Sequence, residues 1–170
     1  MDPGIAADFQ TLAQIAITLM GFTGIIGVIQ TRGGHALAGP EAGLIVTLLV
    51  VSSLAIFASF IPSTIFLLVE DEVSMWKWSF RVLLVAHIFA WIIAIPFMLR
   101  AGILLEALPE PERTITRTFA LVGMSAVVSE AAVVLGYGVT HSDFIYQCVL
   151  VALVAIGFMA FVLLMFGINR

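Results

Sequence analysis

The chain alternates between long apolar stretches and short polar connections. A helix needs about 20 consecutive apolar residues to cross the hydrocarbon core of a bilayer, and five stretches reach that length. They cover residues 8–30, 41–69, 77–105, 113–138 and 143–168. Glycine or proline lies in the first and third connections, as is common where helices end and begin. The pattern predicts one all-α domain over residues 1–170, a polytopic bundle of five transmembrane helices.

The composition indicates which environment this apolar surface faces. Of the 170 residues, 62% are hydrophobic and 11% are charged, whereas about 25% are charged in an ordinary soluble domain. A soluble core of this size could not hide so many apolar side chains, so the excess is expected to face the lipid bilayer.

Charge and cysteine content exclude several classes of protein. The net charge of -4 leaves no basic surface for nucleic acid, so we expect no nucleic-acid partner. The single cysteine, Cys148, excludes an intrachain disulfide and a multi-cysteine metal site. His35 and His141 are expected at opposite membrane faces and therefore cannot join His87 in a bis-histidine haem site. We expect no metal and no cofactor.

The orientation follows from the basic residues near the ends of the stretches. With five spans, one side of the membrane receives Arg32, Arg100, Arg113, Arg117 and Arg170. The positively charged side of a membrane protein is usually cytoplasmic. The N terminus is therefore predicted outside and the C terminus in the cytoplasm, in the plasma or inner membrane of the cell.

An acidic turn lies on the predicted outer side. It consists of Glu70, Asp71 and Glu72, between the second and third stretches. Such a turn is most simply a solvated connection. If several subunits met there, it would instead form an outer vestibule that concentrates cations.

The most informative polar residue is Glu130, because a carboxyl group is costly within a membrane. It lies eight residues before Gly138, or roughly 12 Å from the outer end of the fourth stretch at 1.5 Å per residue. His87 lies ten residues into the third stretch, which runs the opposite way. The two side chains are therefore predicted at similar depth, where they could meet and share a proton.

Further polar groups are expected in the same outer half of the bundle. We assign them with the pair to a candidate ion or proton pathway: Gln14, Thr18, Ser59, Ser63, Tyr137 and Gln147. Pro62 adds an acceptor, because it has no N–H and leaves the carbonyl of Ala58 free to bind water, an ion or a hydroxyl group.

Five glycines are candidate helix-packing positions, because small residues let two membrane helices approach closely. They are Gly21, Gly24, Gly27, Gly123 and Gly157. The first three form a series in the first stretch. We expect self-association through that series or through Gly157, and therefore a homo-oligomer or contacts with other membrane subunits.

Three functional classes follow from these observations. The first is an ion or proton pathway in a homo-oligomer, with Glu130 and His87 at its centre. The second is a non-catalytic accessory or scaffold subunit of a larger membrane complex, which fits the lack of any soluble domain. The third is an intramembrane enzyme. It is disfavoured because the sequence has neither a Gly-x-Ser-x-Gly nor a His-Glu-x-x-His motif.

Overall fold

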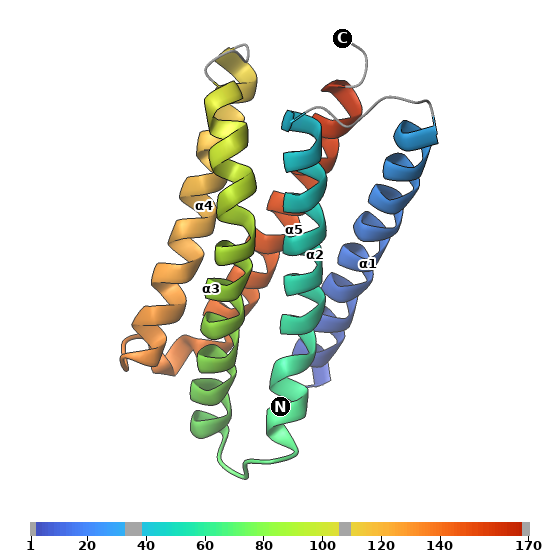
Figure 1. Cartoon of the computed structure of the whole chain (residues 1–170). Helices are drawn as coiled ribbons and strands as arrows, with labels where there is room; N and C mark the ends of the chain where they lie inside the picture. Colours follow the sequence, from blue (N-terminus) through green and yellow to red (C-terminus); the bar gives the residue numbers. More distant parts are fainter. Residues whose placement is uncertain (1–2, 33–38, 106–109, 168–170) are drawn as a thin grey trace.

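The computed structural model describes residues 3–32, 39–105 and 110–167 of the chain. In these residues the secondary structure is entirely helical. The elements are α1 (Pro3–Arg32), α2 (Gly39–Phe66), α3 (Glu72–Leu105), α4 (Glu110–Val134), the short 3-10 helix η1 (Val139–His141) and α5 (Ser142–Gly167). The long helices run up and down beside one another, so that each is antiparallel to the next in sequence (Figure 1). The predicted all-α fold is confirmed.

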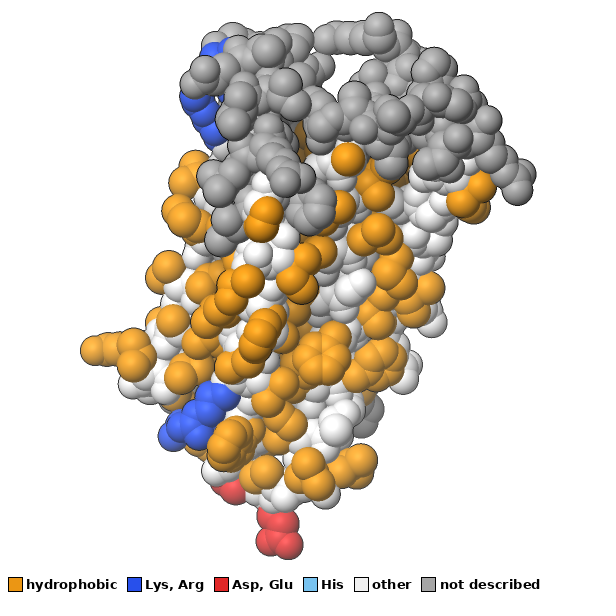
Figure 2. Space-filling view, in the orientation of Figure 1, with side chains coloured by type: hydrophobic (Ala, Val, Ile, Leu, Met, Phe, Trp, Pro, Cys, Tyr) orange, Lys and Arg blue, Asp and Glu red, His pale blue; other side chains and the backbone are white. Residues whose placement is uncertain are grey.

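Each of the five long helices is long and apolar enough to cross a membrane. The apolar windows cover Gly4–Val28, Ala42–Phe66, Glu72–Ala94, Arg117–Val134 and Val139–Met165. Figure 2 shows apolar side chains over the middle of the bundle and acidic side chains at the end where α2 turns into α3. Five such helices indicate a multi-pass membrane protein.

The helix ends differ from the predicted spans where local hydrogen bonds decide them. The third helix begins at Glu72 and not at residue 77, because the Asp71 carboxylate accepts a hydrogen bond of 2.8 Å from the Ser74 backbone N–H. This is the bond of an N-cap. The second helix ends at Phe66, where the N–H groups of Leu68 and Val69 both bond to the carbonyl of Ile65.

The fourth helix ends at Val134, before the predicted residue 138, because two glycines turn the chain. Gly136 and Gly138 have φ values of 100° and 70°, a conformation that glycine adopts without steric cost. The N–H of Tyr137 then bonds to the carbonyl of Ala132 at 2.9 Å and closes the end of the helix. The chain enters η1 and α5 directly from this turn.

An aromatic cluster joins three helices near the end of the bundle where α3 begins. Tyr146 of α5 lies at its centre, with ring centroids 5.6 Å from Phe9 of α1, 5.6 Å from Trp76 and 5.2 Å from Phe80 of α3. All four side chains are buried. The cluster fixes the positions of α1 and α5 against α3, the helix that carries His87.

Candidate functional site

His87 and Glu130 are in direct contact between α3 and α4. The His87 Nδ1 atom lies 2.8 Å from Oε1 of Glu130. Both residues are buried, with His87 3% exposed and Glu130 0% exposed. The contact expected from their matched depths in antiparallel helices is present.

The two helices hold the pair through their buried faces. On α3, Phe80, Leu83 and His87 are buried at intervals of three and four residues, which is the spacing of one helical face. On α4, Ala126 and Glu130 are buried in the same way. The carboxyl and the imidazole therefore meet inside the bundle and not on its surface.

The two carboxyl oxygens of Glu130 differ in their hydrogen bonding. Oε1 is bonded to His87, whereas Oε2 is buried and has no hydrogen-bond partner among the described residues. The bond exists whether the proton is on the imidazole or on the carboxyl, because each group can donate or accept. The pair can therefore hold a proton at either end of the same short contact.

The hydroxyl of Tyr146 makes another buried hydrogen bond between helices. It donates to the carbonyl of Ala58 at 2.8 Å, and this is the oxygen that Pro62 leaves without its helical N–H. The sequence predicted the acceptor but not the donor. The missed signal was the position of Tyr146 near the start of the fifth stretch, at the same end of the bundle as Pro62.

The other proposed pathway residues are not gathered around the pair. Ser59 is buried, but its hydroxyl bonds to the carbonyl of Ala55 in its own helix. Gln147 is half-buried, with its side-chain N–H groups facing the Asp8 carboxylate at 3.4 Å. The remaining four are exposed on the outside of the bundle: Gln14, Thr18, Ser63 and Tyr137. Within one chain, the expected polar layer is therefore not a continuous interior lining.

Comparison of the chain with protein-family models, with curated proteins and with solved structures found no match.

The five glycines differ in what an added Cβ atom would meet. A Cβ atom added to Gly123 would lie 3.4 Å from Trp91, and one added to Gly157 would lie 3.5 Å from the Ser52 hydroxyl. These two glycines bring α4 and α5 close to their neighbours. At Gly21, Gly24 and Gly27 an added Cβ would meet nothing within 4 Å. Gly157 is thus packed inside the bundle, and self-association through the glycines stays a prediction.

The acidic turn is exposed and partly structural. Glu70, Asp71 and Glu72 all lie on the surface, and Asp71 is the N-cap of α3. The hydrogen bonds from Ser74 lower the pKa of the Asp71 carboxyl below its ordinary value, because they favour the ionised form. This geometry fits a solvated turn, and an outer vestibule stays a prediction.

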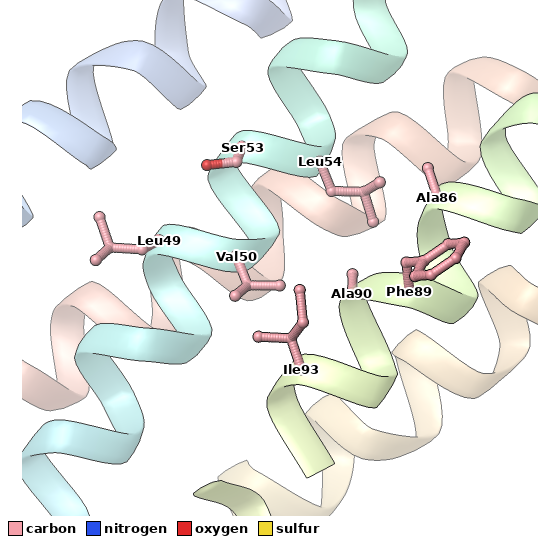
Figure 3. A pocket seen from close by; sticks show the side chains of 8 residues that line it. All are labelled: Leu49, Val50, Ser53, Leu54, Ala86, Phe89, Ala90 and Ile93. Carbon is pink, nitrogen blue, oxygen red and sulfur yellow. The ribbon is translucent and has the colours of Figure 1, made fainter. Parts of the chain in front are cut away.

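A shallow apolar groove of about 460 Å³ lies between α2 and α3 on the outside of the bundle (Figure 3). It is lined by Leu49, Val50, Ser53, Leu54, Ala86, Phe89, Ala90 and Ile93. The Ser53 hydroxyl donates to the Met20 sulfur at 3.6 Å. None of the lining residues is charged. The groove therefore offers no charged group to a ligand, and lipid chains can fill it.

Proposed function

We propose that this protein forms a proton pathway across the membrane and that Glu130 and His87 are its proton-binding site. The observation that carries the proposal is the buried contact of 2.8 Å between His87 Nδ1 and Glu130 Oε1. Carboxyl and imidazole groups within membrane helices are typical of proton relays in pumps and transporters.

The energetics of burial support this role. A buried charge is costly unless it is paired, and Leu at position 130 would avoid the cost, as it does elsewhere in these helices. One shared proton keeps the pair neutral in total, either as carboxylic acid with imidazole or as carboxylate with imidazolium. The proton can move between the two groups without leaving an unpaired charge.

A proton fits the site better than a larger cation. Within the described ranges, no group of three or more His, Cys, Asp or Glu residues could hold a metal ion. A cation without its water needs several oxygen or nitrogen ligands, whereas a proton needs one donor and one acceptor. The unpartnered Oε2 of Glu130 supplies a further acceptor for a water molecule that delivers the proton.

The assembly belongs to the same proposal. We propose an N-out, C-in orientation in the cell membrane, because the last turn of α1 and the first turns of α4, which carry Arg32 and Arg113, lie at one end of the bundle and the acidic turn lies at the other. We also propose a homo-oligomer, in which each chain carries one complete pair.

The test is proton flux into liposomes that contain the purified protein and a pH-sensitive dye. Glu130→Gln keeps the size of the side chain and much of its hydrogen bonding but cannot titrate, so it should abolish the flux. The matched control is Ser129→Ala, because Ser129 is adjacent in sequence and its hydroxyl donates to the carbonyl of Ser125 in its own helix. Flux through Glu130→Gln equal to that of the wild type would overturn the proposal.

Glu130→Leu separates a structural role from a functional one. If the carboxyl serves only to bond His87, Leu should lower the yield of folded protein, because the buried imidazole loses its partner. If the carboxyl serves proton transfer, Gln and Leu should both fold and both lose flux. A Gln variant that folds and has normal flux, beside a Leu variant that fails to fold, would contradict the relay.

The second candidate function is a non-catalytic accessory or scaffold subunit. It is favoured by Gly21 and Gly24, which are exposed on α1 and leave room for a neighbouring helix. Co-purification separates the two functions. A chain that is stable only with other membrane subunits, and that conducts no protons alone, would support the scaffold.

A further inference from the structure

Several exposed hydroxyl groups in the candidate spans form a hydrogen bond within their own helix. Thr11, Thr18 and Thr64 each donate to the backbone carbonyl four residues earlier, at 3.0, 2.8 and 2.9 Å. Ser125 does the same with a carbonyl three residues earlier. Such a hydroxyl can face hydrocarbon with its donor bonded, so it requires no partner from outside the chain.

The carboxamides of α1 differ from these hydroxyls. Gln10 and Gln14 are exposed, and neither side chain has a hydrogen-bond partner within the part of the chain that the structure describes. Gln14 lies well inside the span, about 15 Å along the helix axis from Gly4. A carboxamide carries two N–H donors and one carbonyl acceptor, and lipid chains can bond to none of them.

These carboxamides share one face of α1. At 3.6 residues per turn, Gln10, Gln14, Thr18 and Gly21 fall within a strip of about 80°, and all four are exposed. The buried residues of α1 lie on the opposite face, against α2 and α5: Phe9, Ala13, Ala16, Leu19 and Thr23. Figure 1 shows α1 at the edge of the bundle.

We propose that this strip is where a second copy of the chain docks, with the Gln14 carboxamides paired across a two-fold axis. Two copies inserted in the same orientation are related by an axis along the membrane normal, so the same residue lies at the same depth in both. The carboxamide is self-complementary, because the N–H of one Gln14 can donate to the carbonyl of the other. No further polar group is needed at that depth.

Gly21 supports close approach of the two helices. It lies two turns beyond Gln14 on the same strip, and an added Cβ there would meet nothing within 4 Å of this chain. The absence of a side chain lets the backbones pack. Gly24 lies at the edge of the strip, about 60° from Gly21 at 100° per residue, and contributes less.

This pairing supplies an interface for the homo-oligomer that is part of the proposed function. Its role in proton transport therefore rests on the proposed function. The geometry of α1 does not depend on proton transfer. The His87–Glu130 pair lies between α3 and α4, away from the strip. A dimerisation assay therefore tests the interface without measuring flux, and either proposal can fail alone.

Disulfide cross-linking tests the location of the interface. In a Cys148→Ser background, which removes the only native thiol, Gln14→Cys should give a disulfide-linked dimer in native membranes under mild oxidation. Leu121→Cys is the matched control, because Leu121 is 64% exposed on α4, and it should remain monomeric. Equal cross-linking at both positions would overturn the proposal.

Fluorescence energy transfer between labelled copies, diluted with lipid in liposomes, measures the strength of the interface. Gln14→Leu should raise the dimer Kd by about threefold to thirtyfold, the range for interhelical polar contacts in membranes. Thr18→Val is the matched control on the same strip and should leave the Kd nearly unchanged, because its hydroxyl already bonds within α1.

Either of two outcomes would overturn the pairing. One is a Kd for Gln14→Leu equal to that of the wild type, with normal helix content. The other is a purified chain that stays monomeric at all lipid dilutions but captures a different membrane protein through α1, which would assign the strip to a foreign partner.

Discussion

The hydroxyl of Tyr146 donates a hydrogen bond of 2.8 Å to the carbonyl of Ala58, four residues before Pro62. Proline removes the N–H that would otherwise bond to this carbonyl. A side chain of α5 thus completes the hydrogen bonding of α2. Because Tyr146 also packs against Phe9, Trp76 and Phe80, one residue links four helices near the outer end proposed above.

Tyr146→Phe should destabilise the bundle by about 1–2 kcal/mol, because the carbonyl of Ala58 loses its donor while the ring keeps its packing. The free energy of unfolding in mixed micelles measures the effect. Tyr137→Phe is the control, since Tyr137 is 72% exposed, and it should change stability little. Equal stability of Tyr146→Phe and the wild type would show that water or another group replaces the hydroxyl.

The proposed orientation predicts which turns are accessible from outside the cell. In a Cys148→Ser background, Glu72→Cys should react with a membrane-impermeant thiol reagent added to intact cells, whereas Glu110→Cys should react only after lysis. The two positions begin α3 and α4 at opposite ends of the bundle. The reverse pattern would invert the topology while leaving the fold unchanged.

Gly157→Leu should lower stability by about 1–3 kcal/mol, because the added side chain would push into Ser52 and Leu19 where α5 packs on α2 and α1. Gly21→Leu adds the same volume where no atom lies within 4 Å and should leave the monomer stable. Thermal unfolding in detergent compares them. Similar losses in both variants would mean that Gly21 is packed in the monomer.

Asp71 should make stability depend on pH through the N-cap of α3. Hydrogen bonds from Ser74 hold the pKa of this carboxyl below its ordinary value of 3.8. A carboxyl whose pKa is lower in the folded than in the unfolded state stabilises the protein at pH values above the unfolded-state pKa. This contribution disappears as the pH falls through the folded-state pKa. The wild type should therefore lose more thermal stability than Asp71→Asn between neutral and strongly acidic pH. Parallel curves for the two proteins would exclude the contribution of Asp71.

Hydropathy predicted the number, order and approximate limits of the helices, because a helix that crosses hydrocarbon must be apolar along most of its length. It did not give their ends. The start of α3 at Glu72 depends on a single bond between Asp71 and Ser74, and the end of α4 depends on positive φ at Gly136 and Gly138. These effects involve one or two residues and do not change the average hydropathy.

The pairing of His87 with Glu130 could be predicted because it depends only on depth and helix direction, two quantities that sequence position supplies. The faces of the helices could not be predicted in the same way. Nearly every side of each helix is apolar, so periodicity does not separate side chains that meet protein from those that meet lipid. For this reason Gln14 and Thr18 were expected beside Glu130 and lie on the outside of α1.

The sequence by itself determined a five-helix bundle, the sites where its polar groups interrupt apolar helices, and the carbonyl that Pro62 frees. Only the tertiary structure decided that Tyr146 bonds that carbonyl, that Gly157 packs inside while Gly21 stays open, and that Glu130 keeps one unpartnered oxygen. The physical reason is that the position of a residue in the sequence fixes its depth along the helix axis. Rotation about each helix is fixed by contacts with the other helices, which no single apolar segment encodes.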